Sequence, residues 1–167
     1  PACLRPSPTR TDRGLSPGGK LDIGVIGCGN RALGNIAGVL SENIVAVCDV
    51  DDRYIAALHK RWPQTQRAHA YRDFRRMLER QKLDAVVIST PDHTHALPAV
   101  TAMELGMHVY CEKPLTRTVH EARLVTETAR RQRRATQMGT QIHADSNYRR
   151  VVELIRAGAI GPVDEVH

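Results

Sequence analysis

Two glycines separate a predicted strand from a predicted helix near the start of this chain. Residues 21–26 are apolar and rich in β-branched side chains, which is typical of a buried strand. Gly27 and Gly29 follow, and apolar residues then recur at the spacing of one helix face from Leu33 to Leu40. A Gly-x-Gly pattern at the point where a strand turns into a helix predicts a dinucleotide site.

The chemistry of such a turn explains the residue types. Gly27 permits a tight turn, and Gly29 has no Cβ, so that a pyrophosphate can approach the backbone. Ala32 is small enough for the helix to pack closely on the strand, and free N–H groups at the helix start face the phosphate charge. The alternative is a strand–helix turn that binds no ligand.

Strands and helices alternate along the rest of the chain. Further strands are predicted at 44–49, 67–71, 85–90, 107–111, 135–142 and 163–167, of which 44–49 and 85–90 are apolar as buried parallel strands should be. Helices are predicted between them, with Asp51, Asp73, Thr118 and Asp145 as caps. Alternation of this kind predicts an α/β fold with a doubly wound parallel sheet, a Rossmann fold.

Composition divides the chain into three parts. Residues 1–19 hold four prolines and no periodicity, and we expect a flexible leader there. Residues 20–142 would form the Rossmann domain, and residues 143–167 follow it. No run of about 18 apolar residues occurs, so no transmembrane helix is predicted.

The net charge of +6 comes with 20 Arg and 4 Lys, and four arginines cluster within 130–134. A nucleic-acid-binding patch is one interpretation. We favour the polar end of an amphipathic helix, where cations suit the helix dipole and no aromatic residues are interleaved to stack on bases.

The cysteines and histidines do not predict a metal site. Cys3, Cys28, Cys48 and Cys111 form no Cys-x-x-Cys pair, and we expect free thiols. His93 and His95 alternate, and alternate side chains diverge once a helix begins.

Three strand ends carry candidate site residues. Asp49 lies 22 residues after Gly27, where a carboxylate binds the adenosine ribose and repels a 2′-phosphate, which favours NAD over NADP. Arg53 weakens this preference, because its guanidinium could pair with a 2′-phosphate. Capping of the following turn is the alternative role of Asp49. Thr90-Pro-Asp-His-Thr-His95 and Cys111-Glu-Lys-Pro114 leave later strands toward the same crevice. A cis peptide at Pro114 would direct Lys113, which could donate hydrogen bonds or tune a proton transfer; a solvated surface lysine is the alternative.

Together these segments resemble the Gfo/Idh/MocA family of oxidoreductases. The Gly-x-Gly turn, Thr90–His95, Glu112-Lys-Pro114 and Gly139-Thr-Gln-Ile-His143 occur in the family's order, and the resemblance covers residues 20–167. It implies hydride transfer between NAD(P) and a sugar, inositol or related polyol. It also implies that residues 143–167 are a junction helix and the first strand of a second α+β domain, at the start of which the chain is truncated. The cofactor-binding residues that it implies are Gly27, Gly29, Asn30, Arg31, Asp49, Thr90, Pro91, His93, His95, Glu112, Lys113, Gln141 and His143.

Lys113 is the only catalytic candidate present, since the family's usual catalytic His belongs to a second domain. We therefore expect this chain to bind dinucleotide and to turn over little substrate by itself. An NAD-dependent glycoside hydrolase and a non-catalytic dinucleotide sensor are the alternatives. The resemblance also implies a homo-oligomer; we expect no nucleic-acid or membrane partner, and a cytoplasmic location unless a twin-arginine signal preceded Pro1.

Overall fold

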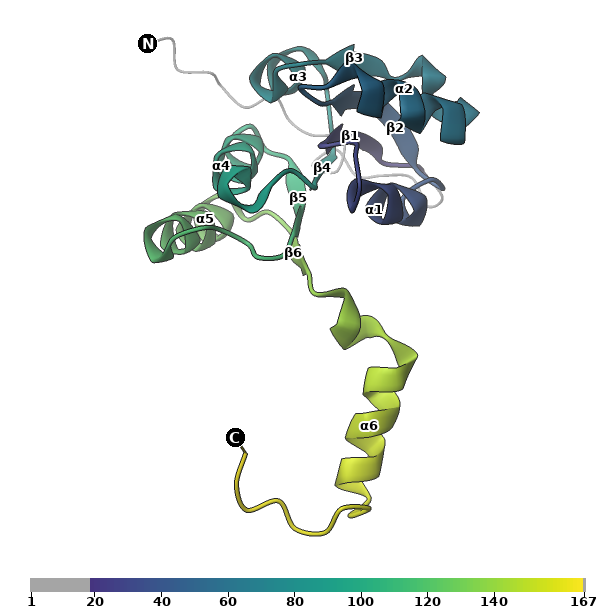
Figure 1. Cartoon of the computed structure of the whole chain (residues 1–167). Helices are drawn as coiled ribbons and strands as arrows, with labels where there is room; N and C mark the ends of the chain where they lie inside the picture. The colour runs from purple at the N-terminus through teal and green to yellow at the C-terminus, as the bar shows by residue number, and fades with distance from the viewer. Residues whose placement is uncertain (1–18, 167) are drawn as a thin grey trace.

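The chain folds around a six-stranded, fully parallel sheet. The computed structural model describes residues 19–166, so most of the predicted leader, residues 1–18, lies outside the described residues. The strand order is β3-β2-β1-β4-β5-β6, which confirms the doubly wound α/β fold (Figure 1). The strands are β1 (Asp22–Ile26), β2 (Asn43–Cys48), β3 (His69–Tyr71), β4 (Ala85–Ile88), β5 (His108–Glu112) and β6 (Thr136–Gly139).

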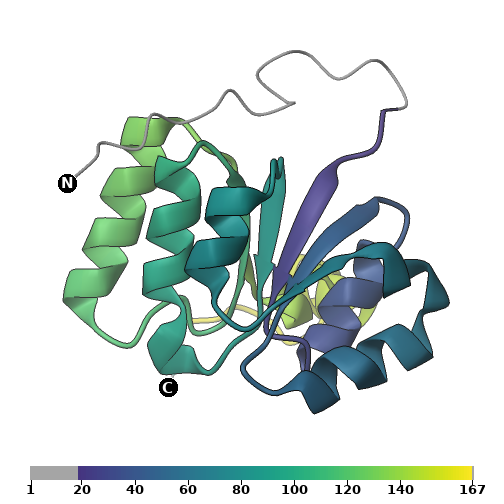
Figure 2. The same cartoon turned by 90° about the horizontal axis from the view of Figure 1, so that it is seen from above.

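Helices cover both faces of the sheet (Figure 2). On one face α1 (Ala32–Gly38) and α2 (Asp52–Arg61) pack through Ile36 and Leu58, both fully buried against Val25 and Val47. The other face carries α3 (Phe74–Arg80), α4 (Ala96–Glu104) and α5 (Val119–Gln132). The central strands therefore need apolar residues on both sides, which explains their continuous apolar runs.

The predicted helix caps are confirmed. The carboxylates of Asp51, Asp73 and Asp145 each accept a hydrogen bond from the backbone N–H two residues later. Thr118 and Glu121 form the predicted capping box at the start of α5.

Two predicted strands differ from the structure. β6 ends at Gly139 instead of Ile142, because the chain turns there into the short 3-10 helix η4 (Gln141–Ala144). Residues 163–166 form no strand, since no neighbouring strand in the described part of the chain supplies the hydrogen bonds that a strand needs.

The arginines at the end of α5 hold neighbouring turns together. Arg134 donates from Nη1 to the carbonyl oxygen of Gly106 at 2.8 Å, which links the α4–β5 turn to the α5–β6 turn. Arg131 pairs with Glu104 of α4 at 3.2 Å. These contacts match the interpretation of this cluster as the polar end of a helix.

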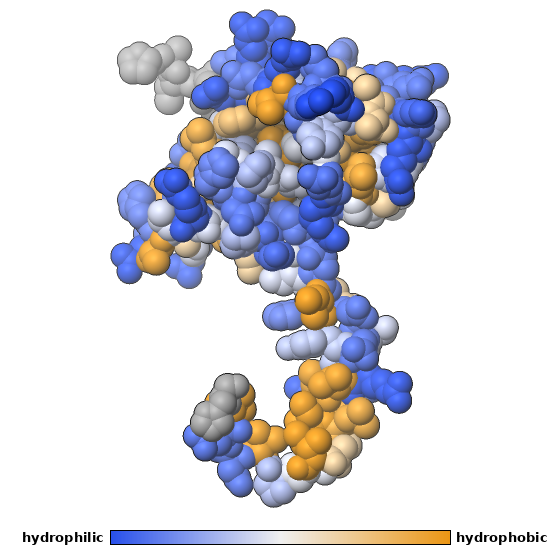
Figure 3. Space-filling view, in the orientation of Figure 1, coloured by the Kyte–Doolittle hydropathy of each residue, from blue (hydrophilic) through white to orange (hydrophobic). Residues whose placement is uncertain are grey.

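Helix α6 (Ser146–Arg156) extends away from the sheet (Figure 1) and has no buried residue. Apolar side chains gather along it and in the segment that follows (Figure 3), among them Val151, Leu154 and Ile160. None of the helices within residues 19–166 is long and apolar enough to cross a membrane.

Replacing Thr118 by Ala should lower the free energy of unfolding by about 1 kcal/mol, because the first turn of α5 loses its side-chain acceptor. The matched control is Thr126→Ala, an exposed threonine within the same helix, which should change stability by less than about 0.5 kcal/mol. Urea denaturation measures both values, and equal effects would contradict a specific role of the cap.

Candidate functional site

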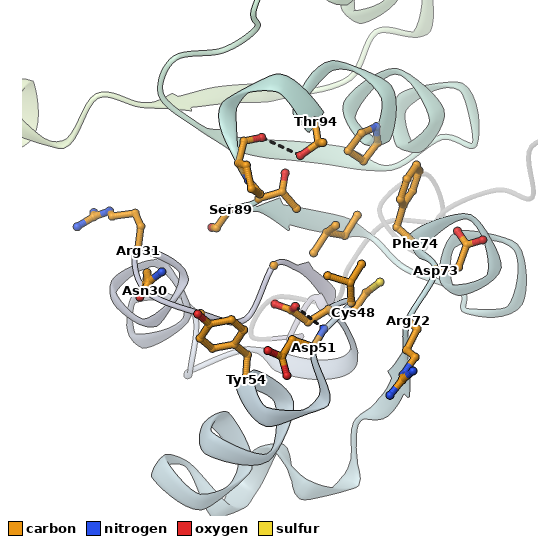
Figure 4. A pocket seen from close by; sticks show the side chains of 18 of the residues that line it. Asn30, Arg31, Cys48, Asp51, Tyr54, Arg72, Asp73, Phe74, Ser89 and Thr94 are labelled. Carbon is orange, nitrogen blue, oxygen red and sulfur yellow. Dashed lines mark hydrogen bonds between the residues drawn. The ribbon is translucent and has the colours of Figure 1, made fainter.

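A pocket of about 850 Å³ opens at the carboxyl ends of β1, β2 and β4. This is where ligands bind in open parallel sheets, and the volume suits a small-molecule ligand or cofactor. Of the residues predicted from the sequence, Gly27, Gly29, Asn30, Arg31, Asp49, Thr90 and Pro91 line it. Tyr54 and Asp51 lie on one side of the pocket, and Thr94 and Phe74 on the other (Figure 4).

The glycine turn places unused donors at this pocket. Gly27 has a φ of 88°, and a Cβ on it would lie 2.7 Å from the backbone of Ser89, so only glycine fits there. Within residues 19–166, the backbone N–H groups of Gly29, Asn30 and Arg31 make no hydrogen bond. Three free N–H groups in one turn form a site suited to an anion such as a pyrophosphate.

At Gly29 the Tyr54 ring lies close to the position that a Cβ would take. A Cβ there would lie 2.7 Å from Cδ1 and Cε1 of Tyr54, whose ring therefore packs directly on the turn. Tyr54 comes from α2 and lines the pocket. Gly29 is thus required by a protein contact as well as by the approach of a ligand expected from the sequence.

Asp49 combines the two roles that the sequence analysis treated as alternatives. Its Oδ1 accepts from the Asp51 N–H at 3.0 Å, which caps the turn after β2. Its Oδ2 accepts from the Cys28 N–H at 2.8 Å, which ties β2 to the glycine turn. The carboxylate is also half-buried in the pocket lining, so it is held in one orientation beside the turn.

Nearby arginines are paired with carboxylates at the start of α2. Arg53 binds Asp51 with Nη2 at 2.6 Å from Oδ2, and Arg72 binds Asp52. The hydrogen bonds of the Arg53 side chain lower the pKa of Asp51 to about 2, and the Arg72 guanidinium lowers the pKa of Asp52. Arg53, which the sequence offered as a partner for a 2′-phosphate, is already engaged.

Thr90 carries an unpaired polar atom. Its Oγ1 is buried and has no hydrogen-bond partner among the described residues, although Thr90 lines the pocket. Burying a hydroxyl without a partner is costly, so a ligand that hydrogen-bonds it would stabilise this arrangement. The free amides, the oriented carboxylate and this hydroxyl together fit the pyrophosphate and ribose groups of a dinucleotide.

The remaining predicted residues lie outside the lining of this pocket. His93 is exposed on η3 (Asp92–Thr94), and His95 is buried behind the Thr90 loop. His143 is exposed and stacks on Tyr148 with ring centroids 5.1 Å apart. His143 therefore packs against a residue of α6.

Glu112 and Gln141 form a polar cluster with Arg31 beside β5 and β6. Glu112 is 5% exposed, and its carboxylate accepts from Gln141 and, at 3.3 Å, from Arg31 Nε. A Cβ on Gly139 would lie 2.6 Å from both Glu112 Oε1 and the Tyr110 hydroxyl. Lys113 is exposed, and its side chain makes no hydrogen bond or ion pair within the described chain. The Lys113–Pro114 bond is cis, as predicted.

Sequence reasoning missed several residues of the pocket. Tyr54, Phe74 and Pro98 line it, and the sequence analysis named none of them as site residues. Each lies in the first turn of a helix that follows a strand, and this position was the available signal. Every helix that follows the carboxyl end of a parallel strand begins near the crevice.

Burial disfavours the thiolate form of the cysteines near the site. Cys28, Cys48 and Cys111 are free and buried, as expected, and burial raises each thiol pKa from 9.0 to about 12. Asp49 adds to the increase for Cys28 and Cys48, because a nearby carboxylate disfavours a thiolate.

Comparison with known proteins identifies the family. Residues 21–140 match the GFO_IDH_MocA profile, described as an oxidoreductase family with an NAD-binding Rossmann fold. The chain belongs to the Gfo/Idh/MocA family of oxidoreductases. It contains the family's NAD-binding Rossmann domain, which agrees with the groups found in the pocket.

Relatives in this family include two kinds of named enzyme. The chain is 33% identical over 153 residues to an inositol 2-dehydrogenase of Salmonella typhimurium, covering 89% of this chain and 44% of that protein. It is 30% identical over 151 residues to a glycosyl hydrolase family 109 protein of Shewanella pealeana, covering 83% and 32%. The chain thus spans less than half the length of these relatives.

Solved structures share the fold. Scyllo-inositol dehydrogenase from Lactobacillus casei superposes with a TM-score of 0.73 and 23% identity, over 86% of this chain and 43% of that one. The WlbA dehydrogenase from Bordetella pertussis, solved with NADH and UDP-GlcNAcA, gives a TM-score of 0.74 at 21% identity, over 83% and 42%.

Gly29→Ala should destabilise the protein more when Tyr54 is present than in a Tyr54→Ala background, because the added Cβ meets the Tyr54 ring. A double-mutant cycle of unfolding free energies should give a coupling of at least about 0.5 kcal/mol. Additive effects of the two substitutions would mean that Tyr54 moves away without cost.

At pH 8 the three buried thiols should react with DTNB far more slowly in the folded than in the unfolded protein. A pKa of about 12 in place of 9.0 lowers the thiolate fraction about a thousandfold. Raised thiol pKa values also stabilise the fold below pH 9, and this contribution should be lost as the pH rises toward 12. The assay uses Cys3→Ser protein, and rapid modification without unfolding would contradict the burial.

Proposed function

We propose that the whole protein is an NAD-dependent oxidoreductase acting on a CH–OH group of a sugar, inositol or related polyol, and that this chain supplies its cofactor site. The observation that carries the proposal is the pocket itself. It joins three free turn amides, the oriented Asp49 carboxylate and the unpaired Thr90 hydroxyl. Relatives named inositol 2-dehydrogenase support the substrate class.

Different residues of the chain would bind different parts of the cofactor. The amides of Gly29, Asn30 and Arg31 would bind the pyrophosphate, and Asp49 the hydroxyls of the adenosine ribose. Asp49 would also repel a 2′-phosphate, and Arg53 and Arg72 are neutralised by Asp51 and Asp52. These charges favour NAD over NADP, and bound NAD would supply the hydride acceptor.

Lys113 is the catalytic candidate. It follows β5 at the same edge of the sheet as the pocket, and its ammonium group is exposed. In this role it would donate hydrogen bonds to a substrate hydroxyl and the cofactor's second ribose, and would tune the proton transfer that accompanies hydride loss. Its neighbour Glu112 would contribute from the buried cluster with Gln141, while His93 and His143 remain predictions as cofactor-binding residues.

The glycosyl hydrolase family 109 relatives favour a second candidate function. An enzyme of that kind would use bound NAD in a closed redox cycle that cleaves a glycosidic bond. The same pocket would serve, so the reaction balance separates the two. Net NADH formation supports the dehydrogenase, and sugar release without net NADH supports the hydrolase.

Partners and location are proposed from the sequence. We expect a homo-oligomer of the full-length protein, without nucleic-acid or membrane partners. A cytoplasmic location is proposed, with export after an upstream twin-arginine signal as the alternative.

Calorimetric titration of this chain with NAD and NADP tests the cofactor site. We expect tighter binding of NAD, and Asp49→Asn should lower the NAD-to-NADP preference by about tenfold, because the charge that repels the 2′-phosphate is removed while an acceptor oxygen remains. Glu127→Gln, an exposed carboxylate of α5, is the control and should leave the ratio unchanged. A folded chain that binds neither nucleotide would refute the proposed site.

A further inference from the structure

His95 lies between two loops of the site and contacts both. It precedes α4 at its N-cap position, and it is 1% exposed. Its Nε2 lies 2.8 Å from the carbonyl oxygen of Thr90, and its Nδ1 lies 2.7 Å from that of Pro114. One buried imidazole therefore spans two backbone segments that follow different strands.

Both segments have a place in the proposed function. Thr90 lines the cofactor pocket after β4, and Pro114 directly follows Lys113 after β5. Carbonyl oxygens only accept hydrogen bonds, so only His95 can donate in these contacts: a neutral imidazole has one N–H and donates to one of the two carbonyls at a time, and an imidazolium donates to both. The separation of the Thr90 carbonyl and the Pro114 carbonyl is set by the width of one imidazole ring.

We propose that His95 is a positioning residue that fixes the Lys113–Pro114 segment relative to the Thr90 side of the cofactor pocket. This inference rests on the proposed function, because it assigns His95 a role in cofactor binding through its neighbours. It replaces the direct contact with the dinucleotide that the family resemblance implied. His95 acts from behind the pocket, since it does not line it.

The sheet order determines which half of the cofactor should depend on His95. Asp49 follows β2 and the glycine turn follows β1, whereas the His95 contacts join the ends of β4 and β5. The adenosine and pyrophosphate groups would rest on the first pair of strands. The nicotinamide riboside half would face the second pair, so loss of His95 should weaken binding of that half alone.

Comparing NAD with ADP isolates that half, because ADP lacks the nicotinamide riboside. In calorimetry, His95→Gln should weaken NAD binding by about tenfold, the effect of one lost hydrogen bond, while ADP binding stays within about twofold. The Gln amide can replace Nε2 toward Thr90, and the Asn amide can replace Nδ1 toward Pro114. His95→Asn should therefore retain NAD better than His95→Gln if the Pro114 contact positions Lys113.

His59→Gln is the matched control. His59 is half-buried and also uses Nδ1, toward Thr65 Oγ1 at 2.9 Å, but it lies outside the pocket. This variant should bind NAD and ADP like the unchanged chain. Equal losses of NAD and ADP in His95→Gln, or no loss of either, would overturn the proposal.

Hydrogen exchange of the ligand-free chain tests, independently of the proposed function, whether His95 holds the Lys113–Pro114 segment in place. Amides of residues 112–118 should exchange at least about tenfold faster in His95→Gln, while those of β1 and β2 keep their rates. Unchanged exchange at 112–118 would overturn the role of His95 even if NAD binds. A chain that binds neither NAD nor ADP would refute the proposed function. The exchange rates would still show whether His95 holds the Lys113–Pro114 segment. His95→Ala, which removes both contacts, serves the same measurement if His95→Gln does not fold.

Discussion

The parallel alignment of β1 with β2 and β4 is the constraint on which the site depends. The register pairs Ile26 with Cys48 on one side and with Ile88 on the other, so three strands end at one level. The glycine turn, Asp49 and Thr90 follow those ends and meet around a single pocket. Burial of the central strands on both faces holds that register, because a slip would misplace apolar residues on both faces.

Polar groups at this edge stabilise the fold and prepare the site at the same time. Asp49 caps the turn after β2 and also holds the Cys28 N–H, so its carboxylate is oriented before any ligand arrives. Gly29 admits the Tyr54 ring as well as leaving its own N–H free. A site preorganised in this way spends little binding free energy on ordering its own side chains.

Much of the fold and part of the site could be predicted from the sequence. Local patterns identified the six strands, the four caps and the glycine turn, because each depends on residues close together in the chain. Tyr54 contacts Gly29, and His95 contacts Pro114. Each contact joins segments that are far apart in the chain, so no local sequence pattern predicts it. The end of β6 at Gly139 was missed for a related reason, since no residue between Ala135 and Ile142 marks in the sequence where the strand ends and η4 begins.

Glu112 and Lys113 show why a motif does not assign roles to its members. The family resemblance places both residues beside the nicotinamide ribose. Side chains alternate between the faces at the end of a strand. Glu112 accordingly turns into the cluster with Arg31 and Gln141, while Lys113 is exposed. The Glu112 carboxylate is 5% exposed and already accepts hydrogen bonds from an arginine and an amide. The free ammonium of Lys113 keeps all three of its donors. Glu112 therefore braces the glycine turn against the end of β6, whereas the Lys113 side chain stays exposed beside it.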